Sequence, residues 1–176
     1  MRRERAGFTL VELLVALSIG AVVLVSARAL LDGLASHART TVRAMHDADA
    51  QANAERLARQ VAGNLVLARD PAPSFVGTVS EAVFESWCSA ARGGLERCRV
   101  RIELSSDPNE PGILLSQTGG ATIPLLRGTN ARLRYLSDAA DGGRWQDVWR
   151  MPQTPPLAIS ATAGGRSLVL RIGELR

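Results

Sequence analysis

The sequence predicts an α+β fold in which one long N-terminal α-helix is followed by a mainly antiparallel β head. Residues 8–27 form an apolar run in which Glu12 is the only ionisable side chain. Apolar residues then recur every three or four positions as far as Leu65, among them Ala52, Leu57 and Val61, with no proline before Pro71. That spacing is typical of an amphipathic helix. From residue 71 onward, short apolar or alternating segments are separated by Gly- and Pro-containing turns, which indicates strands.

The first apolar run is long enough to cross a bilayer. About 20 helical residues at about 1.5 Å each span a hydrocarbon core of roughly 30 Å. Three arginines precede the run, at positions 2, 3 and 5. Positive residues stay on the cytoplasmic side, so the rest of the chain is expected to cross the membrane.

Glu12 needs a physical reason to lie so close to the start of this run. A carboxylate inside hydrocarbon costs a few kcal/mol unless it is paired or protonated. One interpretation is that Glu12 reaches back to the nearby lipid headgroups. The other begins with cleavage after Gly7, which would leave a new α-amine on Phe8. In an assembly of parallel helices, that cation could pair with Glu12 of a neighbouring molecule.

The segment Gly7-Phe8-Thr9-Leu10-Val11-Glu12 resembles the class III signal of type IV pilins and type II secretion pseudopilins. The resemblance implies that a prepilin peptidase cuts after Gly7 and methylates Phe8, while the apolar segment is retained. An ordinary secretory signal is instead cut after its apolar region and lost. The acidic residue at the fifth mature position of the family falls on Glu12, which implies a role in subunit register and assembly.

Pattern and resemblance together divide the chain into four parts. These are a leader (1–7), a transmembrane half (8–27) and an amphipathic half (28–70) of one helix, and a β-rich periplasmic head (71–176). Within the head, strands are expected at 74–77, 82–88, 98–104, 113–117, 122–126, 131–136, 157–161 and 167–172. Pro124 places its strand at an edge or a bulge, and Gly164-Gly165 forms the turn of the last hairpin.

Composition limits the function classes. Only 4% of the residues are aromatic, so a core must be built from Leu, Val, Ile and Ala. The formal charge is +4, of which the leader's three arginines and one glutamate supply half. So small and scattered a charge predicts no nucleic-acid partner.

Cys88 and Cys98 are the only cysteines. If the head lies in a periplasm, they can form a disulfide between neighbouring strands. The alternative is two separate thiols.

The residues around Tyr135, Trp145 and Trp149 carry a second resemblance. Leu133-Arg134-Tyr135-Leu136, Gly143 to Trp149, and Pro156-Leu157-Ala158-Ile159 are similar to the J-type minor pseudopilin of type II secretion. This resemblance implies a position near the pseudopilus tip, bound to the I- and K-type minor pseudopilins. The three aromatic residues are therefore candidates for an interface, or alternatively for plain packing over one end of a small core.

No pattern in the sequence predicts an enzyme, a cofactor or a metal site. His37 and His46 are nine residues apart, so they fall on opposite faces of a helix and cannot share a metal. The cysteines lack zinc-ligand spacing. Asp138, Asp141 and Asp147 could contribute oxygens to calcium, but their spacing matches no EF-hand loop, and a solvated loop is the favoured interpretation.

The function that we predict is a minor pseudopilin of the type II secretion system, which primes pseudopilus assembly and supports the export of folded proteins. Its expected partners are the I- and K-type minor pseudopilins, the major pseudopilin, the prepilin peptidase and the inner-membrane assembly platform. The alternative is a minor type IV pilin that primes a fibre for adhesion, motility or DNA uptake. A third hypothesis is a membrane-anchored binding domain that never enters a fibre.

Overall fold

The computed structural model describes residues 9–67, 75–90, 93–138, 142–151 and 153–173. The chain forms two compact units that divide between Ala48 and Asp49. The helix α1, Leu10–Gly63, contributes to both units. Each unit is described by itself.

The first unit consists of α1 as far as Ala48. Thr9 precedes the helix, and the Glu12 amide donates to the Thr9 carbonyl (3.1 Å) and to its Oγ1 (3.4 Å). The Ser18 and Ser26 hydroxyls each donate to the carbonyl four residues earlier, at 2.9 and 2.8 Å. Such bonds satisfy hydroxyls inside an apolar segment.

Every described residue from Thr9 to Ala50 is exposed. By length and by a mean hydropathy of 2.5 over its most apolar window, α1 could cross a membrane. The side chains of this segment therefore find no packing partners within their own unit.

The helix ends at Gly63, several residues before the predicted end near residue 70. Gly disfavours helix continuation, and the next residues find hydrogen bonds on a strand instead. Leu65 forms an antiparallel bridge with Ser86, and the Val66 amide donates to the Glu85 carbonyl at 2.9 Å. Strand pairing thus replaces the last predicted turns of helix.

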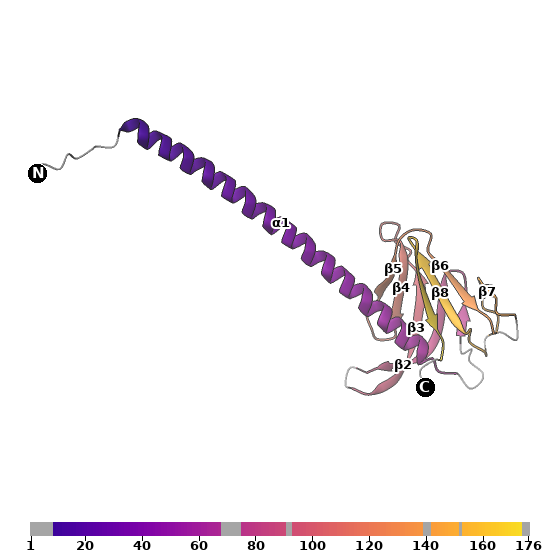
Figure 1. Ribbon diagram of the computed structural model, residues 1–176. Helices are drawn as coiled ribbons and strands as arrows, with labels where there is room; N and C mark the ends of the chain where they lie inside the picture. Colours follow the sequence, from indigo (N-terminus) through magenta and orange to yellow (C-terminus); the bar gives the residue numbers. More distant parts are fainter. Residues whose placement is uncertain (1–8, 68–74, 91–92, 139–141, 152, 174–176) are drawn as a thin grey trace, which may run out of the picture. The chain divides into compact units, whose positions relative to one another are not determined.

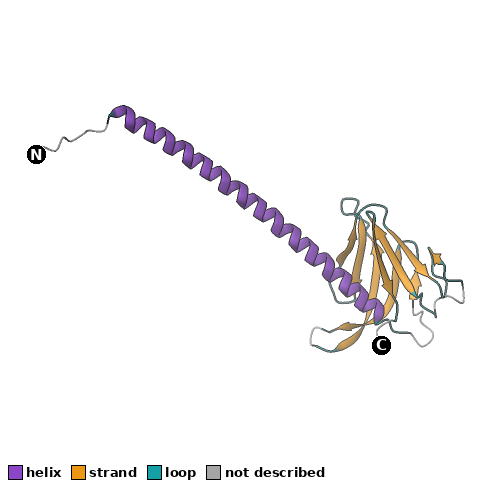
Figure 2. Ribbon diagram, in the orientation of Figure 1, coloured by secondary structure: helices purple, strands orange, loops and turns teal. Residues whose placement is uncertain are grey.

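The head contains two antiparallel sheets (Figure 2), which confirms the predicted α+β class. The first has the order β1-β2-β3-β4-β5. Its strands are β1 Phe75–Gly77, β2 Glu81–Ser89, β3 Leu95–Leu104, β4 Gly112–Gln117 and β5 Ile123–Arg127. β3 begins earlier than the predicted residue 98, because Leu95 to Arg97 continue the ladder opposite β2.

The second sheet has the order β7-β6-β8-β9. Its strands are β6 Arg132–Leu136, β7 Trp145–Gln146, β8 Ala158–Ala163 and β9 Arg166–Arg171. Gly164 and Gly165 join β8 to β9 with φ of 57° and 78°. Two consecutive positive φ values fit a type I′ hairpin turn, which glycine adopts without steric cost.

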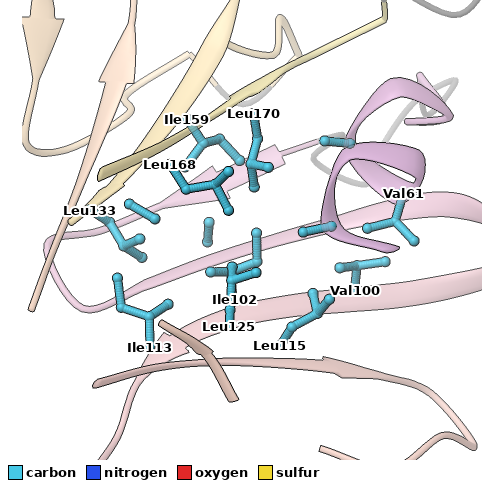
Figure 3. Packing of buried hydrophobic residues seen from close by; sticks show 14 of the residues in the cluster. Val61, Val100, Ile102, Ile113, Leu115, Leu125, Leu133, Ile159, Leu168 and Leu170 are labelled. Atoms are coloured by element: carbon cyan, nitrogen blue, oxygen red, sulfur yellow. The ribbon is translucent and has the colours of Figure 1, made fainter. Parts of the chain in front are cut away.

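The core of the head lies between the two sheets and the last turns of α1 (Figure 3). The second sheet supplies Leu133, Ile159, Leu168 and Leu170, which face Ile102 and other side chains of the first sheet. Buried and exposed residues alternate along β2, β3, β8 and β9, as expected when one face of each strand is covered.

From α1 the core receives mainly small side chains. Ala54, Ala58, Val61 and Ala62 are buried, and Leu57 packs against them. The predicted apolar stripe included Leu57 and Val61, but it placed Ala52 on the buried face, and Ala52 is exposed. The side chains of the buried Ala54, Ala58 and Ala62 are small, which lets the helix approach the sheets closely.

The edge strand β5 carries a bulge, as the position of Pro124 predicted. The β4–β5 register shifts between Ile113 and Leu114, so Leu125 has no partner on β4. The Leu125 carbonyl instead accepts a 2.6 Å hydrogen bond from Gln51 Nε2 on α1. A backbone group left unpaired by the bulge is thereby satisfied within the head.

Candidate functional site

The segment predicted to direct processing and assembly, residues 7–12, lies near the N-terminus. Gly7 and Phe8, the predicted cleavage and methylation positions, lie outside the described residues. Thr9 occupies the N-cap position and Glu12 lies in the first turn of α1. Thr-x-x-Glu is the capping-box pattern, and a carboxylate near a helix N-terminus is stabilised by about 0.3–1 kcal/mol. Sequence reasoning missed this local role of Glu12.

Capping alone does not account for the environment of Glu12. Its side chain is exposed among apolar neighbours, including Leu10, Val11 and Leu13. Within the part of the chain that the structure covers, no hydrogen bond or ion pair is formed by the Glu12 carboxylate. The carboxylate is therefore available to a cation from another molecule.

An open groove runs along the same helical segment. It is lined by Leu13, Ala16, Leu17, Gly20, Ala21 and Leu24. A Cβ added at Gly20 would meet no atom within 4 Å. Nothing in the surrounding chain therefore requires glycine there, although glycine costs a helix roughly 1 kcal/mol relative to alanine.

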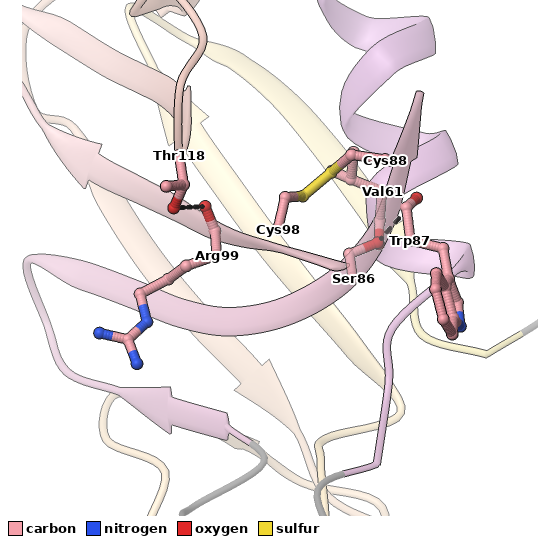
Figure 4. Close-up of a disulfide and its surroundings, with 7 residues drawn as sticks. All are labelled: Val61, Ser86, Trp87, Cys88, Cys98, Arg99 and Thr118. Carbon is pink, nitrogen blue, oxygen red and sulfur yellow. Dashed lines mark hydrogen bonds between the residues drawn. A yellow bond between two sulfur atoms is a disulfide. The ribbon is translucent and has the colours of Figure 1, made fainter. Parts of the chain in front are cut away.

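The predicted disulfide is present in the head. Cys88 on β2 and Cys98 on β3 are bonded, with their Cα atoms 5.9 Å apart (Figure 4). Both cysteines are buried and belong to the core cluster. Next to them, the buried Ser86 hydroxyl donates to the Val61 carbonyl of α1 at 2.7 Å. The bridge thus fixes the β2–β3 hairpin beside the end of the helix.

The structure places Tyr135 and Trp149 in the core. Tyr135 packs edge-on against Phe75, and its hydroxyl lies 2.7 Å from the Thr78 carbonyl and 2.9 Å from the Glu81 carbonyl. Burial raises the pKa of the Tyr135 phenol above its usual range, with a further contribution from the nearby Glu81 carboxylate. Tyr135 is therefore a neutral hydrogen-bond donor that holds the β1–β2 turn.

Trp149 is 6% exposed, and its indole Nε1 donates to the carbonyls of Met151 (2.8 Å) and Thr154 (2.7 Å). Gly77 makes room for both aromatic residues. A Cβ at Gly77 would lie 2.7 Å from Tyr135 Cζ and 2.9 Å from Trp149 Cβ. Trp145 on β7 is only half-buried. Of the three predicted aromatic residues, Trp145 alone offers substantial surface to a partner.

In the loop considered for calcium, the Asp147 carboxylate is paired with arginines. Asp147 forms ion pairs with Arg132 (2.7 Å) and Arg134 (3.4 Å). Asp141 lies outside the described residues, and among those described no cluster of three or more His, Cys, Asp or Glu residues could hold a metal. Asp147 therefore serves to connect β6 with the segment after β7.

Comparison with known proteins identifies the N-terminal segment. Residues 2–27 match the family model of the prokaryotic N-terminal methylation motif. The chain carries the N-methylation motif of prokaryotic pilin- and pseudopilin-type proteins. The motif indicates a pilin-like protein that a prepilin peptidase processes and that assembles with other pilin-like subunits into a filament. No curated protein matches the chain.

Sequence reasoning missed two features of the head. One is the exposed Trp87 on β2. The strand alternation could have indicated it, because Trp87 must face outward once Cys88 faces the core. The other is a polar cluster at the end of α1, in which Glu55 contacts Gln51, Arg59 and Arg166. That cluster depends on the docking of helix and sheets, which the sequence does not reveal.

Proposed function

We propose that this protein is a minor pseudopilin of a type II secretion system. In this role it is a structural subunit rather than an enzyme. Its cleaved helix enters a helical bundle, and its head binds sibling subunits near the pseudopilus tip. The observation that carries the proposal is the methylation motif at the start of the chain, which includes the beginning of an exposed apolar helix that leads to a disulfide-bonded β head.

Glu12 has two roles in this proposal. Before assembly, the carboxylate lies in the first turn of α1, where it interacts favourably with the helix dipole. During assembly, the exposed carboxylate pairs with the Phe8 α-amine of the neighbouring subunit. Such a pair offsets the cost of a charge in hydrocarbon and fixes the axial register of the two helices.

The groove around Gly20 supports packing of parallel helices. Small residues let helix backbones approach closely in a membrane or a filament core. The lining of this groove includes the small residues Ala16, Gly20 and Ala21. The otherwise unexplained glycine is then used between molecules rather than within one.

The proposed location is the bacterial inner membrane, with a cytoplasmic N-terminus and a periplasmic head. The Arg-rich leader supports this orientation by the positive-inside rule, and the disulfide suits an oxidising compartment. The partners in this proposal are the I- and K-type minor pseudopilins, the major pseudopilin and the assembly platform. The tip complex primes the pseudopilus, whose growth helps to export folded proteins.

Two measurements test the proposal. Mass spectrometry of the mature chain should find Phe8 at the N-terminus, one methyl group heavier than unmodified phenylalanine. A chain that retains Met1 to Gly7 would contradict assembly into a filament and favour a membrane-anchored binding domain. Co-purification should then recover the I- and K-type pseudopilins. Recovery of minor pilins of a surface fibre would instead identify the protein as a minor type IV pilin, to which the same motif also belongs.

A further inference from the structure

The end of the β2–β3 hairpin extends beyond the rest of its sheet (Figure 1). β4 pairs with β3 only from Val100 onward, and the Thr118 amide adds one bond to the Arg99 carbonyl. On the other side, the chain after α1 reaches β2 as far as Trp87, whose amide donates to the Asn64 carbonyl. We call residues 87–90 and 93–99 the projecting hairpin.

The two faces of the projecting hairpin differ in burial. On the inner face, Cys88 and Cys98 are only 4% and 7% exposed. On the outer face, Trp87 is 43% exposed and Leu95 is 61% exposed. A two-stranded hairpin alone is marginally stable in water, and the disulfide at the base of this one holds its register. The outer face of this disulfide-linked hairpin therefore presents a large aromatic side chain.

One arginine on the outer face forms no ion pair among the described residues. Of the arginines on the outer face of β3, Arg97 pairs with Glu85 at 2.8 Å, and Arg101 pairs with two glutamates at 3.3 and 3.5 Å. Arg99 lies opposite Glu85 in the ladder, but that carboxylate is bound to Arg97. Among the residues that the structure describes, Arg99 has no acidic partner.

Arg99 lies at an open hollow. Arg99 shares the outer face with Trp87, because Trp87 is paired with Arg97 in the ladder and side chains two residues apart on a strand lie on one face. The hollow has a volume of about 330 Å³ and is lined by Glu85, Arg97, Cys98, Arg99 and Thr118. Figure 4 shows Cys98, Arg99 and Thr118 from this lining. The hollow is large enough for a side chain from another protein. Its unbalanced charge favours a carboxylate, because an Arg–carboxylate bond is both strong and directional.

We propose that the outer face of the projecting hairpin binds a second pilin-like subunit through Trp87 and Arg99. The partner covers Trp87 and Leu95 with apolar side chains and places an Asp or Glu carboxylate against Arg99. Trp and Arg are the residue types most enriched at interface hot spots. The inference depends on the proposed function for the class of partner, and it adds the surface that this partner contacts.

The test uses the full chain, co-expressed with the pilin-like subunits of its own organism and purified in detergent. The subunits that co-purify are identified, and the dissociation constant of the strongest complex is measured. Trp87→Ala should weaken binding by about 30-fold, the effect of a typical hot spot. Arg99→Glu should weaken it by about 10-fold or more, because it places like charges together.

Two matched variants control for nonspecific effects. Val169→Ala removes an apolar side chain of similar exposure from β9 (46% exposed), and Arg127→Glu reverses an exposed charge on β5. Both should bind within about twofold of the unmodified chain. An intact disulfide and an unchanged melting temperature verify that each variant is folded. Reversal of the contacting carboxylate to Arg on the partner should restore binding to Arg99→Glu.

The outcomes separate the two proposals. If the unmodified chain co-purifies with its subunits and both hairpin variants bind as well as it does, the docking surface is overturned while the proposed function stands. Equal losses in hairpin and control variants would also overturn the surface. If no pilin-like subunit co-purifies with the unmodified chain, the proposed function fails, and the docking inference fails with it.

Discussion

The two units of the chain use the same apolar residues in opposite ways. In the helix before Ala48, leucine side chains such as Leu13 and Leu24 are exposed, whereas Leu133 and Leu170 in the head are completely buried. An α-helix satisfies its own backbone hydrogen bonds but leaves its side chains outside. In the head, the two sheets and the last turns of α1 cover one another's apolar side chains. The first unit therefore needs an apolar environment from outside the chain, and the head does not.

Polar side chains show the same contrast. In the first unit, the hydroxyls of Ser18 and Ser26 bond to the helix that carries them. In the head, polar groups connect different elements: Gln51 binds the Leu125 carbonyl and Ser86 binds the Val61 carbonyl. The two serine hydroxyls in the helix thus bond within that helix, and the polar groups in the head fix the docking of its parts.

The largest effect is expected at Glu12. Glu12→Ala should abolish incorporation of the chain into filaments, because the Phe8 amine of the next subunit loses its carboxylate partner. The head should fold normally, since Glu12 belongs to the other unit. The measurement is the fraction of mature chain recovered in sheared or cross-linked filaments, together with the melting temperature of the head.

Thr9→Ala is the matched control for Glu12. It removes the Oγ1 that caps the helix, at a cost of about 0.5–2 kcal/mol of helix stability, and it retains the carboxylate. Substantial assembly is expected from this variant. If Thr9→Ala stops assembly as completely as Glu12→Ala does, helix capping explains the requirement and intermolecular pairing does not.

A pair of identical substitutions tests the contrast in burial directly. Leu170→Ala should lower the free energy of unfolding of the head by about 2–5 kcal/mol, through lost burial and a cavity. Leu24→Ala, at a site that is 73% exposed, should leave it unchanged. Denaturant unfolding in detergent can follow tryptophan fluorescence, since all three tryptophans belong to the head. Equal losses from the two variants would contradict the independence of the units.

The next test measures how much the disulfide contributes to the free energy of unfolding of the head. The double variant Cys88→Ala with Cys98→Ala should lose about 2–3 kcal/mol of unfolding free energy, the chain-entropy value for a loop of about ten residues. Reduction of the unmodified protein should cost a similar amount. A reductant should have no further effect on the double variant. An unmodified protein that withstands reduction without loss would show that the bridge adds little to the packing around it.

The N-terminal assembly segment and most strands could be predicted because they depend on local pattern. The run that follows Gly7, the alternation along β3 and β6, and the turn at Gly164 are each determined within a few residues. The pairing of Cys88 with Cys98 required one further assumption, an oxidising compartment. Pro124 indicated an edge strand or a bulge, because proline cannot donate a ladder hydrogen bond, and β5 has both features.

The features that sequence reasoning missed depend on contacts between distant segments. The helix ends at Gly63 because Leu65 and Val66 find partners on β2, which helical periodicity cannot reveal. Trp149 is buried because the sheets dock around it, and the local sequence pattern does not reveal that docking. In the sequence, Gly77 indicates only the end of a strand. In the structure, its missing Cβ makes room for Tyr135 and Trp149.

The smallest expected effect concerns the ion pair between α1 and β9. Glu55 Oε1 lies 3.2 Å from an Arg166 side-chain nitrogen, and Arg166 is more than half exposed. Arg166→Gln should therefore cost at most about 1 kcal/mol of unfolding free energy, and high salt should reduce the difference. Arg127→Gln, at an exposed position on β5, is the matched control and should have no effect. A loss as large as that of Leu170→Ala would mean that polar docking of the helix end, rather than apolar burial, dominates the stability of the head.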